Sequence, residues 1–192
     1  MPNLKNDGGE VKLHLGSGER YLPGYCHIDL DDYPHINYHQ DIHDLPMFKS
    51  DSVDEVYCSH VLEYFDRFEA EYALREWHRV LKPSGILRIA VPDFEGIVKV
   101  YQKYKDVDHK GILGPLYGKR PLGSGLIYHH TVYDFNSLKR LLEKTGFKNV
   151  HRYDVVQLFK TFPEGYDDQS FAFIPHKDPK GILVSLNVEA EK

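Results

Sequence analysis

Short apolar segments alternate with amphipathic helical patterns along most of this chain of 192 residues. Such alternation is typical of βαβ units, in which parallel strands form a central sheet. The last apolar segment, residues 181–190, alternates apolar and polar positions and is expected to pair antiparallel. The fold class is therefore α/β, with a mostly parallel central sheet and an antiparallel strand near the C-terminus. The other expected strands are residues 11–15, 26–30, 36–39, 52–60, 86–91 and 149–156.

Three helices are expected between these strands, because apolar residues recur there at steps of three and four. Asp93 is placed to cap the second helix, and Gly146 closes the third. Residues 106–126 are rich in glycine and proline, which predicts a long loop that acts as a lid. The expected inner faces are Phe68, Tyr72, Ala73, Trp77, Val80 and Leu81, then Ile97, Tyr101 and Tyr104, then Leu138, Leu141 and Leu142.

Composition narrows the class of protein. An apolar fraction of 41% and a charged fraction of 28% predict that residues 1–192 fold as a single domain. The formal charge of −5 and the lack of a long basic cluster argue against a nucleic-acid partner. No apolar run of transmembrane length occurs, and the polar first ten residues lack a signal core. We therefore expect a cytoplasmic protein without a membrane partner.

Glycines and carboxylates cluster where the predicted strands end. Gly16 and Gly18 follow the first strand, Asp29 ends the second, and Asp41 follows the third. Ligands of open α/β sheets bind at this edge, where a strand-end carboxylate can accept hydrogen bonds from ribose hydroxyls. Asp41 is a candidate acceptor for an adenine amine, although it could instead cap the turn that follows it.

The helix expected after such a glycine turn is nearly absent, because Pro23 and Gly24 interrupt it. A pyrophosphate is held mainly by the first turn of a helix, so a dinucleotide would lose its anchor. This disfavours a nicotinamide oxidoreductase. S-adenosylmethionine carries ribose and adenine without phosphates, and it suits the pattern.

Five motifs occur in order: LHLGSG, IDL, QDIHDLP, SVDEVYCSHVLEYF and LREWHRVLKPSGILRIAVP. Together they resemble the motifs of class I S-adenosylmethionine-dependent methyltransferases of the type 11 kind, and DFNSLKRLLEKTGF continues the likeness to Phe147. The resemblance implies a Rossmann-like fold, here with a shortened first helix, and S-adenosyl-L-methionine as cofactor. It also implies the cofactor-binding residues Gly16, Ser17, Gly18, Asp29, Leu30, Asp41, Ile42, Ser59 and His60.

The acceptor side of the site is less defined. His129 and His130 are the best candidates for a catalytic base, with packing residues as the alternative. Lys119 and Arg120 suit a substrate phosphate, unless they belong to a solvated loop. His35, His39 and His43 recur every four residues, but Pro34 and the strand-like INYH argue against a helix that would gather them around zinc, so no metal is expected.

The sequence thus predicts an enzyme that transfers a methyl group from S-adenosylmethionine to an O, N or C atom of a small acceptor, such as a sugar or a phosphate-bearing metabolite. The alternative is a cofactor-binding module without transfer activity that acts through a partner surface. The oligomeric state is open.

Overall fold

A computed structural model describes residues 6, 8–159, 167, 169–176 and 178–192. Seven strands form the central sheet in the order β3-β2-β1-β4-β5-β11-β8. Strands β3, β2, β1, β4 and β5 are parallel, and β11 pairs antiparallel with both β5 and β8. This confirms the α/β class, the mostly parallel sheet and the antiparallel strand near the C-terminus. No helix of the described chain is long and apolar enough to span a membrane.

The elements have the following bounds. The central strands are β1 Lys12–Leu15, β2 Cys26–Asp29, β3 Tyr38–His39, β4 Val53–Ser59, β5 Leu81–Pro92, β8 Lys148–Arg152 and β11 Ser185–Glu191. Two small hairpins pair β6 Arg120–Leu122 with β7 Gly125–Ile127, and β9 Phe173–Ile174 with β10 Ile182–Leu183. The helices are η1 Leu62–Tyr64, α1 Arg67–Val80, α2 Phe94–Tyr104, α3 Lys110–Tyr117, α4 Phe135–Lys144 and α5 Val155–Phe159.

Each expected strand overlaps an observed one, but two expected segments are divided. The expected strand 149–156 ends at Arg152, and α5 begins at Val155. The apolar run 181–190 is divided between β10 and β11 at Val184. The amide of Val184 donates to Ala172 O, and its carbonyl accepts from Asp93 N. The first bond leads away from the central sheet, whereas the second continues the pairing of β11 with the end of β5 by one residue.

The three expected helices form, with two of their inner faces corrected. Phe68 and Tyr72 of α1 are 85% and 61% exposed, whereas Ala70 and Leu74 are buried with Trp77. In α2, Tyr101 and Tyr104 are exposed and Val100 is buried beside Ile97. The helical spacing of aromatic residues therefore predicts the wrong inner face for both helices. Small and branched residues pack closest to the sheet instead. Asp66, Asp93 and Asp134 cap α1, α2 and α4.

The prediction of a long loop over residues 106–126 is wrong, since this segment holds α3, β6 and the start of β7. Two of its five glycines, Gly111 and Gly118, serve close packing. A Cβ on Gly111 would lie 2.8 Å from Ile174 Cγ1, and a Cβ on Gly118 would lie 2.0 Å from His129 Nε2. Composition alone does not distinguish glycines that loosen a loop from glycines that let a helix approach its neighbours.

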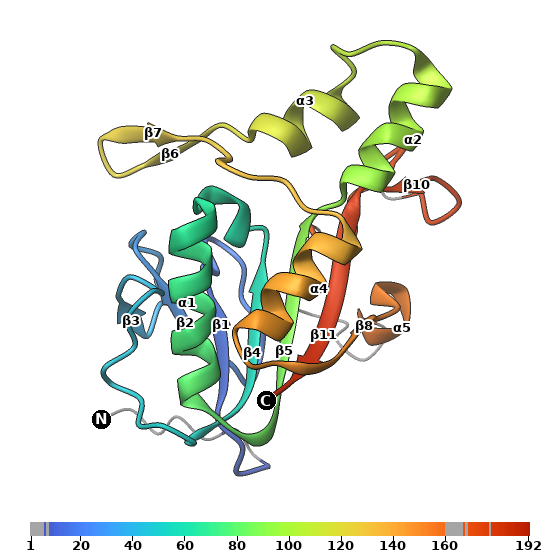
Figure 1. Cartoon of the computed structure of the whole chain (residues 1–192). Coiled ribbons are helices and arrows are strands. Elements are labelled where there is room, and N and C mark those ends of the chain that lie inside the picture. Colours follow the sequence, from blue (N-terminus) through green and yellow to red (C-terminus); the bar gives the residue numbers. More distant parts are fainter. Residues whose placement is uncertain (1–5, 7, 160–166, 168, 177) are drawn as a thin grey trace.

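The central sheet has two unlike faces. Helices α1 and α4 cover one face, where Leu13, Val56 and Ile89 belong to the main core (Figure 1). On the other face, Glu55 pairs with Lys12 and Arg88, and Arg88 also pairs with Glu189, so an ionic ladder crosses four strands.

Turns rather than a helix connect β1 to β2 over residues 16–25, all of which are described. The first helix, which the sequence predicts to be shortened, is therefore absent between these two strands. Without that helix, the second face of the sheet is covered by loops and by residues near the C-terminus. Leu22 packs there in one cluster with Tyr57, Val155 and Phe173.

Candidate cofactor and acceptor site

The strand order reverses between β1 and β4, and the chain makes a glycine turn at this point. Gly16 has φ +65°, and a Cβ there would lie 2.4 Å from Val61 Cγ2. Gly18 also has a positive φ of +53°, with no atom within 4 Å of the place where its Cβ would be. The turn therefore needs glycine for close contact at its start and for backbone conformation at its end, and it leaves room for a ligand.

Asp29 ends β2 and is buried at the edge of the sheet. The amide of Gly18 donates to its Oδ2 at 2.7 Å, and the amide of Asp31 donates to its Oδ1 at 2.8 Å. Each carboxylate oxygen keeps a further lone pair, so the group can still accept both hydroxyls of a ribose. The carboxylate of Asp31, two residues further on, instead pairs with Arg120.

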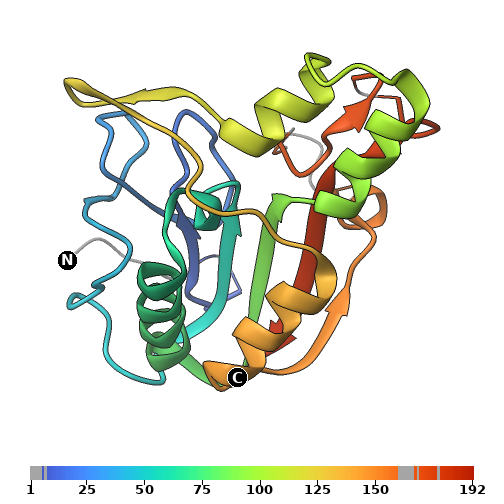
Figure 2. The ribbon, with the colours of Figure 1, turned by 45° about the horizontal axis from the view of Figure 1, so that its top comes forward.

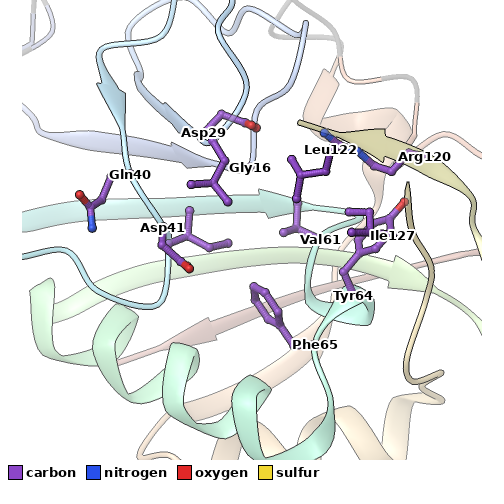
Figure 3. A pocket seen from close by; sticks show the side chains of 12 residues that line it. Gly16, Asp29, Gln40, Asp41, Val61, Tyr64, Phe65, Arg120, Leu122 and Ile127 are labelled. Atoms are coloured by element: carbon purple, nitrogen blue, oxygen red, sulfur yellow. The ribbon is translucent and has the colours of Figure 1, made fainter. Parts of the chain in front are cut away.

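A pocket of about 530 Å³ opens beside Asp29. Figure 3 shows Asp29 and Asp41 on one side of it and the hairpin residues Arg120, Leu122 and Ile127 on the other. We call it the adenosine pocket. Its remaining lining residues are Gly16, Leu30, Gln40, Ile42, Val61, Tyr64 and Phe65.

The position of Asp41 is compatible with both roles considered from the sequence. Its Oδ1 accepts from the backbone amide of His43 at 3.0 Å, as a turn cap does. The same side chain borders the adenosine pocket, where its second oxygen remains an acceptor. Capping and adenine recognition are therefore compatible.

Two buried hydroxyls fit the polar end of S-adenosylmethionine. Ser17 lies in the glycine turn and Ser59 ends β4, and neither Oγ has a hydrogen-bond partner among the described residues. A buried polar group without a partner is unusual in a folded protein. The amino and carboxylate groups of a methionine moiety would satisfy both. The residues present therefore fit this cofactor.

A second pocket, of about 870 Å³, adjoins the first, and Tyr64 and Arg120 line both. We call it the acceptor pocket. His60, Glu63 and His129 line it, together with Gly118 and Lys119. Burial and the neighbouring Glu63 raise the pKa of Tyr64 to about 12, so its hydroxyl keeps its proton between the two pockets. In Figure 2 the β6–β7 hairpin, drawn in yellow, extends over the edge of the sheet to which the glycine turn after β1 belongs.

The two adjacent histidines differ in position. His129 Nδ1 lies 2.9 Å from Pro115 O, and its ring packs edge-on against Tyr64. His130 is exposed and lines, with Thr131, another pocket that His129 also borders, but it does not line the acceptor pocket. The structure therefore brings His129, and not His130, to the acceptor pocket.

Sequence reasoning missed Glu63. It follows the Ser59–His60 pair within the quoted motif SVDEVYCSHVLEYF, and the spacing of a carboxylate three residues after a histidine was the available signal. The hairpin contribution to the adenosine pocket was also missed, because the segment was assigned to a loop.

The three histidines that recur every four residues, His35, His39 and His43, do not form a cluster. His39 lies 3.5 Å from Asp32, His43 pairs with Asp41, and the ring of His35 contacts Tyr33. Within the part of the chain that the structure describes, no three histidine, cysteine or acidic side chains are arranged to hold a metal ion.

Residues 25–89, which include Asp29, β4 and α1, match the family model described as a methyltransferase domain. The match spans about a third of the chain and agrees with the resemblance that the sequence motifs carry. A search of curated proteins found no match to this chain.

Several solved structures of methyltransferases share the fold of this chain. An S-adenosylmethionine-dependent methyltransferase from Mesorhizobium loti aligns over 100% of this chain and 94% of its own, with 19% identity and a TM-score of 0.56. The 1,6-didemethyltoxoflavin-N1-methyltransferase of Burkholderia thailandensis, solved with S-adenosylhomocysteine, covers 94% and 70%, with 14% identity and a TM-score of 0.55. A Haloferax volcanii methyltransferase in complex with the Trm112 activator covers 98% and 84%, with 17% identity and a TM-score of 0.54.

Proposed function

We propose that residues 1–192 act as one domain that methylates a small acceptor, a sugar or a phosphate-bearing metabolite, in the acceptor pocket. The observation that carries the proposal is the shared wall of the two pockets at Tyr64 and Arg120. A molecule in the acceptor pocket would lie next to the cofactor. The formal charge of −5 supports a small acceptor over a nucleic acid.

On this proposal Asp29 accepts from the ribose hydroxyls, and Asp41 accepts from the adenine amine. Leu30 and Ile42 flank the adenine ring, since both line the adenosine pocket. The backbone of Gly16 and Gly18 approaches the ligand closely. Ser17, Ser59 and His60 lie on the side of the methionine moiety.

Lys119 is the candidate anchor for a phosphate on the acceptor. Its side chain is exposed at the mouth of the acceptor pocket. Arg120, the other sequence candidate, is paired with Asp31. We therefore assign the phosphate to Lys119 first.

When bound, S-adenosylmethionine supplies an electrophilic methyl group on sulfur. The protein aligns the acceptor atom and excludes water, and a base is needed where that atom carries a proton. The carbonyl oxygen of Pro115 can only accept a hydrogen bond, so the hydrogen of a neutral His129 is on Nδ1. Its Nε2 then has a lone pair with which to take the acceptor's proton.

The test is isothermal titration with S-adenosylhomocysteine, followed by mass spectrometry of methyl transfer to a panel of sugars and sugar phosphates. Once an acceptor is known, His129→Ala should lower the turnover rate by roughly 10²–10⁴ while cofactor affinity stays unchanged. His130→Ala is the matched control, because this neighbour lies outside the acceptor pocket. Equal rates for wild type and His129→Ala would remove the histidine from the mechanism.

A further inference from the structure

Glu63 is the least explained residue of the acceptor pocket. Its side chain is 0% exposed, and neither carboxylate oxygen accepts an aligned hydrogen bond from any residue in the described part of the chain. Burying a carboxylate without donors is strongly unfavourable. Such a group in a pocket wall is explained most simply by a ligand that supplies the missing donors.

The nearest ring nitrogens do not supply them. Glu63 Oε1 lies 3.7 Å from His129 Nε2 and 3.2 Å from His60 Nδ1. As argued above, Nε2 of a neutral His129 has a lone pair, because Nδ1 donates to Pro115 O. His129 Nε2 and Glu63 Oε1, which both accept protons, therefore face each other.

Hydrogen bonds beyond His60 set the same arrangement on its side. Asn187 Nδ2 donates to Ser170 O at 3.1 Å, which leaves Asn187 Oδ1 to accept from the Ser185 hydroxyl at 3.4 Å. Ser185 Oγ then accepts from His60 Nε2 at 3.0 Å. The hydrogen of a neutral His60 is thus on Nε2, and Nδ1 presents its lone pair to Glu63.

Three proton-accepting atoms with one formal negative charge therefore converge at the wall of the acceptor pocket. We infer that Glu63, His60 and His129 bind the ammonium group of an amine-bearing acceptor, whose nitrogen is the atom that is methylated. An ammonium has several N–H donors and a positive charge, which complement this set, whereas a hydroxyl has one donor and no charge. The inference rests on the proposed function and deepens it, since an amino sugar satisfies both.

The transfer step balances with these residues. The bound ammonium gives one proton to His129 Nε2, and its nitrogen regains a lone pair. That lone pair forms the new carbon–nitrogen bond as the methyl carbon–sulfur bond breaks, and the sulfur keeps the electron pair. The methylated nitrogen is left positively charged beside Glu63.

The experiment uses glucosamine and glucose as matched probes, because they differ in one amino group. NMR signals of the His60 and His129 rings are followed in protein saturated with S-adenosylhomocysteine. Glucosamine should shift both signals, and glucose at equal concentration should not. Glu63→Gln should weaken glucosamine binding about tenfold or more, the loss expected for a hydrogen bond to a charged group. Glu143→Gln removes the same charge from exposed α4 and should change nothing.

Equal responses to the two sugars, or none to glucosamine up to its solubility limit, would overturn the inference. Ring shifts that appear only with added Zn²⁺ would do the same. Glu63→Gln should keep or raise the melting temperature, since it removes an uncompensated buried charge, whereas a large decrease would indicate a structural role and contradict the inference.

Calorimetry on the same samples separates the proposed methyl transfer from the amine assignment. Failure to bind S-adenosylhomocysteine contradicts both, and binding without a glucosamine response contradicts only the amine assignment.

Discussion

At the scale of single residues, Asp29 links the backbone of the glycine turn to the proposed ribose position. Its two oxygens already hold the amides of Gly18 and Asp31. Asp29→Ala should weaken S-adenosylhomocysteine binding by about 1.5–3 kcal/mol, or roughly 10- to 150-fold, because hydrogen bonds to a charged group are lost. Isothermal titration measures this directly.

The neighbouring Asp32→Ala is the control for that measurement, since the Asp32 side chain is 94% exposed and paired only with His39 among the described residues. Circular dichroism shows whether each variant remains folded. A folded Asp29→Ala protein with wild-type affinity would move the ribose contact away from this carboxylate.

At the scale of elements, the β6–β7 hairpin covers the adenosine pocket through Leu122 and Ile127. The Arg120–Asp31 ion pair fastens it to the segment after β2. A partly exposed pair of this kind contributes up to about 1 kcal/mol, so Asp31→Asn should release S-adenosylhomocysteine about two- to fivefold faster. Stopped-flow displacement gives the rate.

Asp32→Asn serves as the matched control for the hairpin, because it makes the same change one residue away. Exchanging the partners in an Asp31→Arg/Arg120→Asp double variant should recover part of the slower release. Identical release rates in wild type and Asp31→Asn would show that the ion pair does not hold the hairpin over the cofactor.

At the scale of the whole molecule, the missing first helix leaves His14 and His27 buried under loops on the polar face of the sheet. Burial lowers the pKa of His27 to about 4, and the nearby His35 adds to the shift. Burial, with His27, Arg20 and His35 nearby, also lowers the pKa of His14 well below its usual value. Both histidines are therefore neutral in the folded protein at pH values where they charge in the unfolded chain.

The free energy of unfolding should consequently be highest above pH 6.5 and fall as the pH decreases towards 4. Below about pH 6.5 these histidines bind protons in the unfolded state but not in the folded state. The free energy of unfolding should therefore fall by up to about 1.4 kcal/mol per pH unit for each histidine. Urea melts at pH 7, 6 and 5 measure the decline. His27→Gln should flatten this decline in unfolding free energy, because glutamine does not titrate. The variant should remain folded, since the amide oxygen of glutamine can still accept from the Leu22 amide, as His27 Nε2 does.

The exposed His151→Gln is the control, and it should leave the pH dependence unchanged. A wild-type decline equal to that of His27→Gln would mean that His27 is protonated in the folded protein, contrary to its burial.

The sequence by itself determined the order of the strands along the chain, the glycine turn, and the carboxylates at the strand ends. These features are local: a short apolar run sets a strand, and the end of a parallel strand sets the edge of the sheet to which Asp29 and Asp41 belong. The absence of a helix between β1 and β2 was also readable, because Pro23 and Gly24 act on their own neighbours. That local signal favoured a cofactor without phosphates.

Only the tertiary structure decided which residues form the acceptor pocket. Glu63, His60 and His129 come from segments up to 69 positions apart, and they meet because the amides of His130 and Thr131 donate to the Glu63 carbonyl. The same holds for segment 106–126, where glycines that suggest a loop instead allow α3 to pack against Ile174 and the turn after it to pack against His129. Close packing depends on neighbours distant in sequence, so composition cannot reveal it.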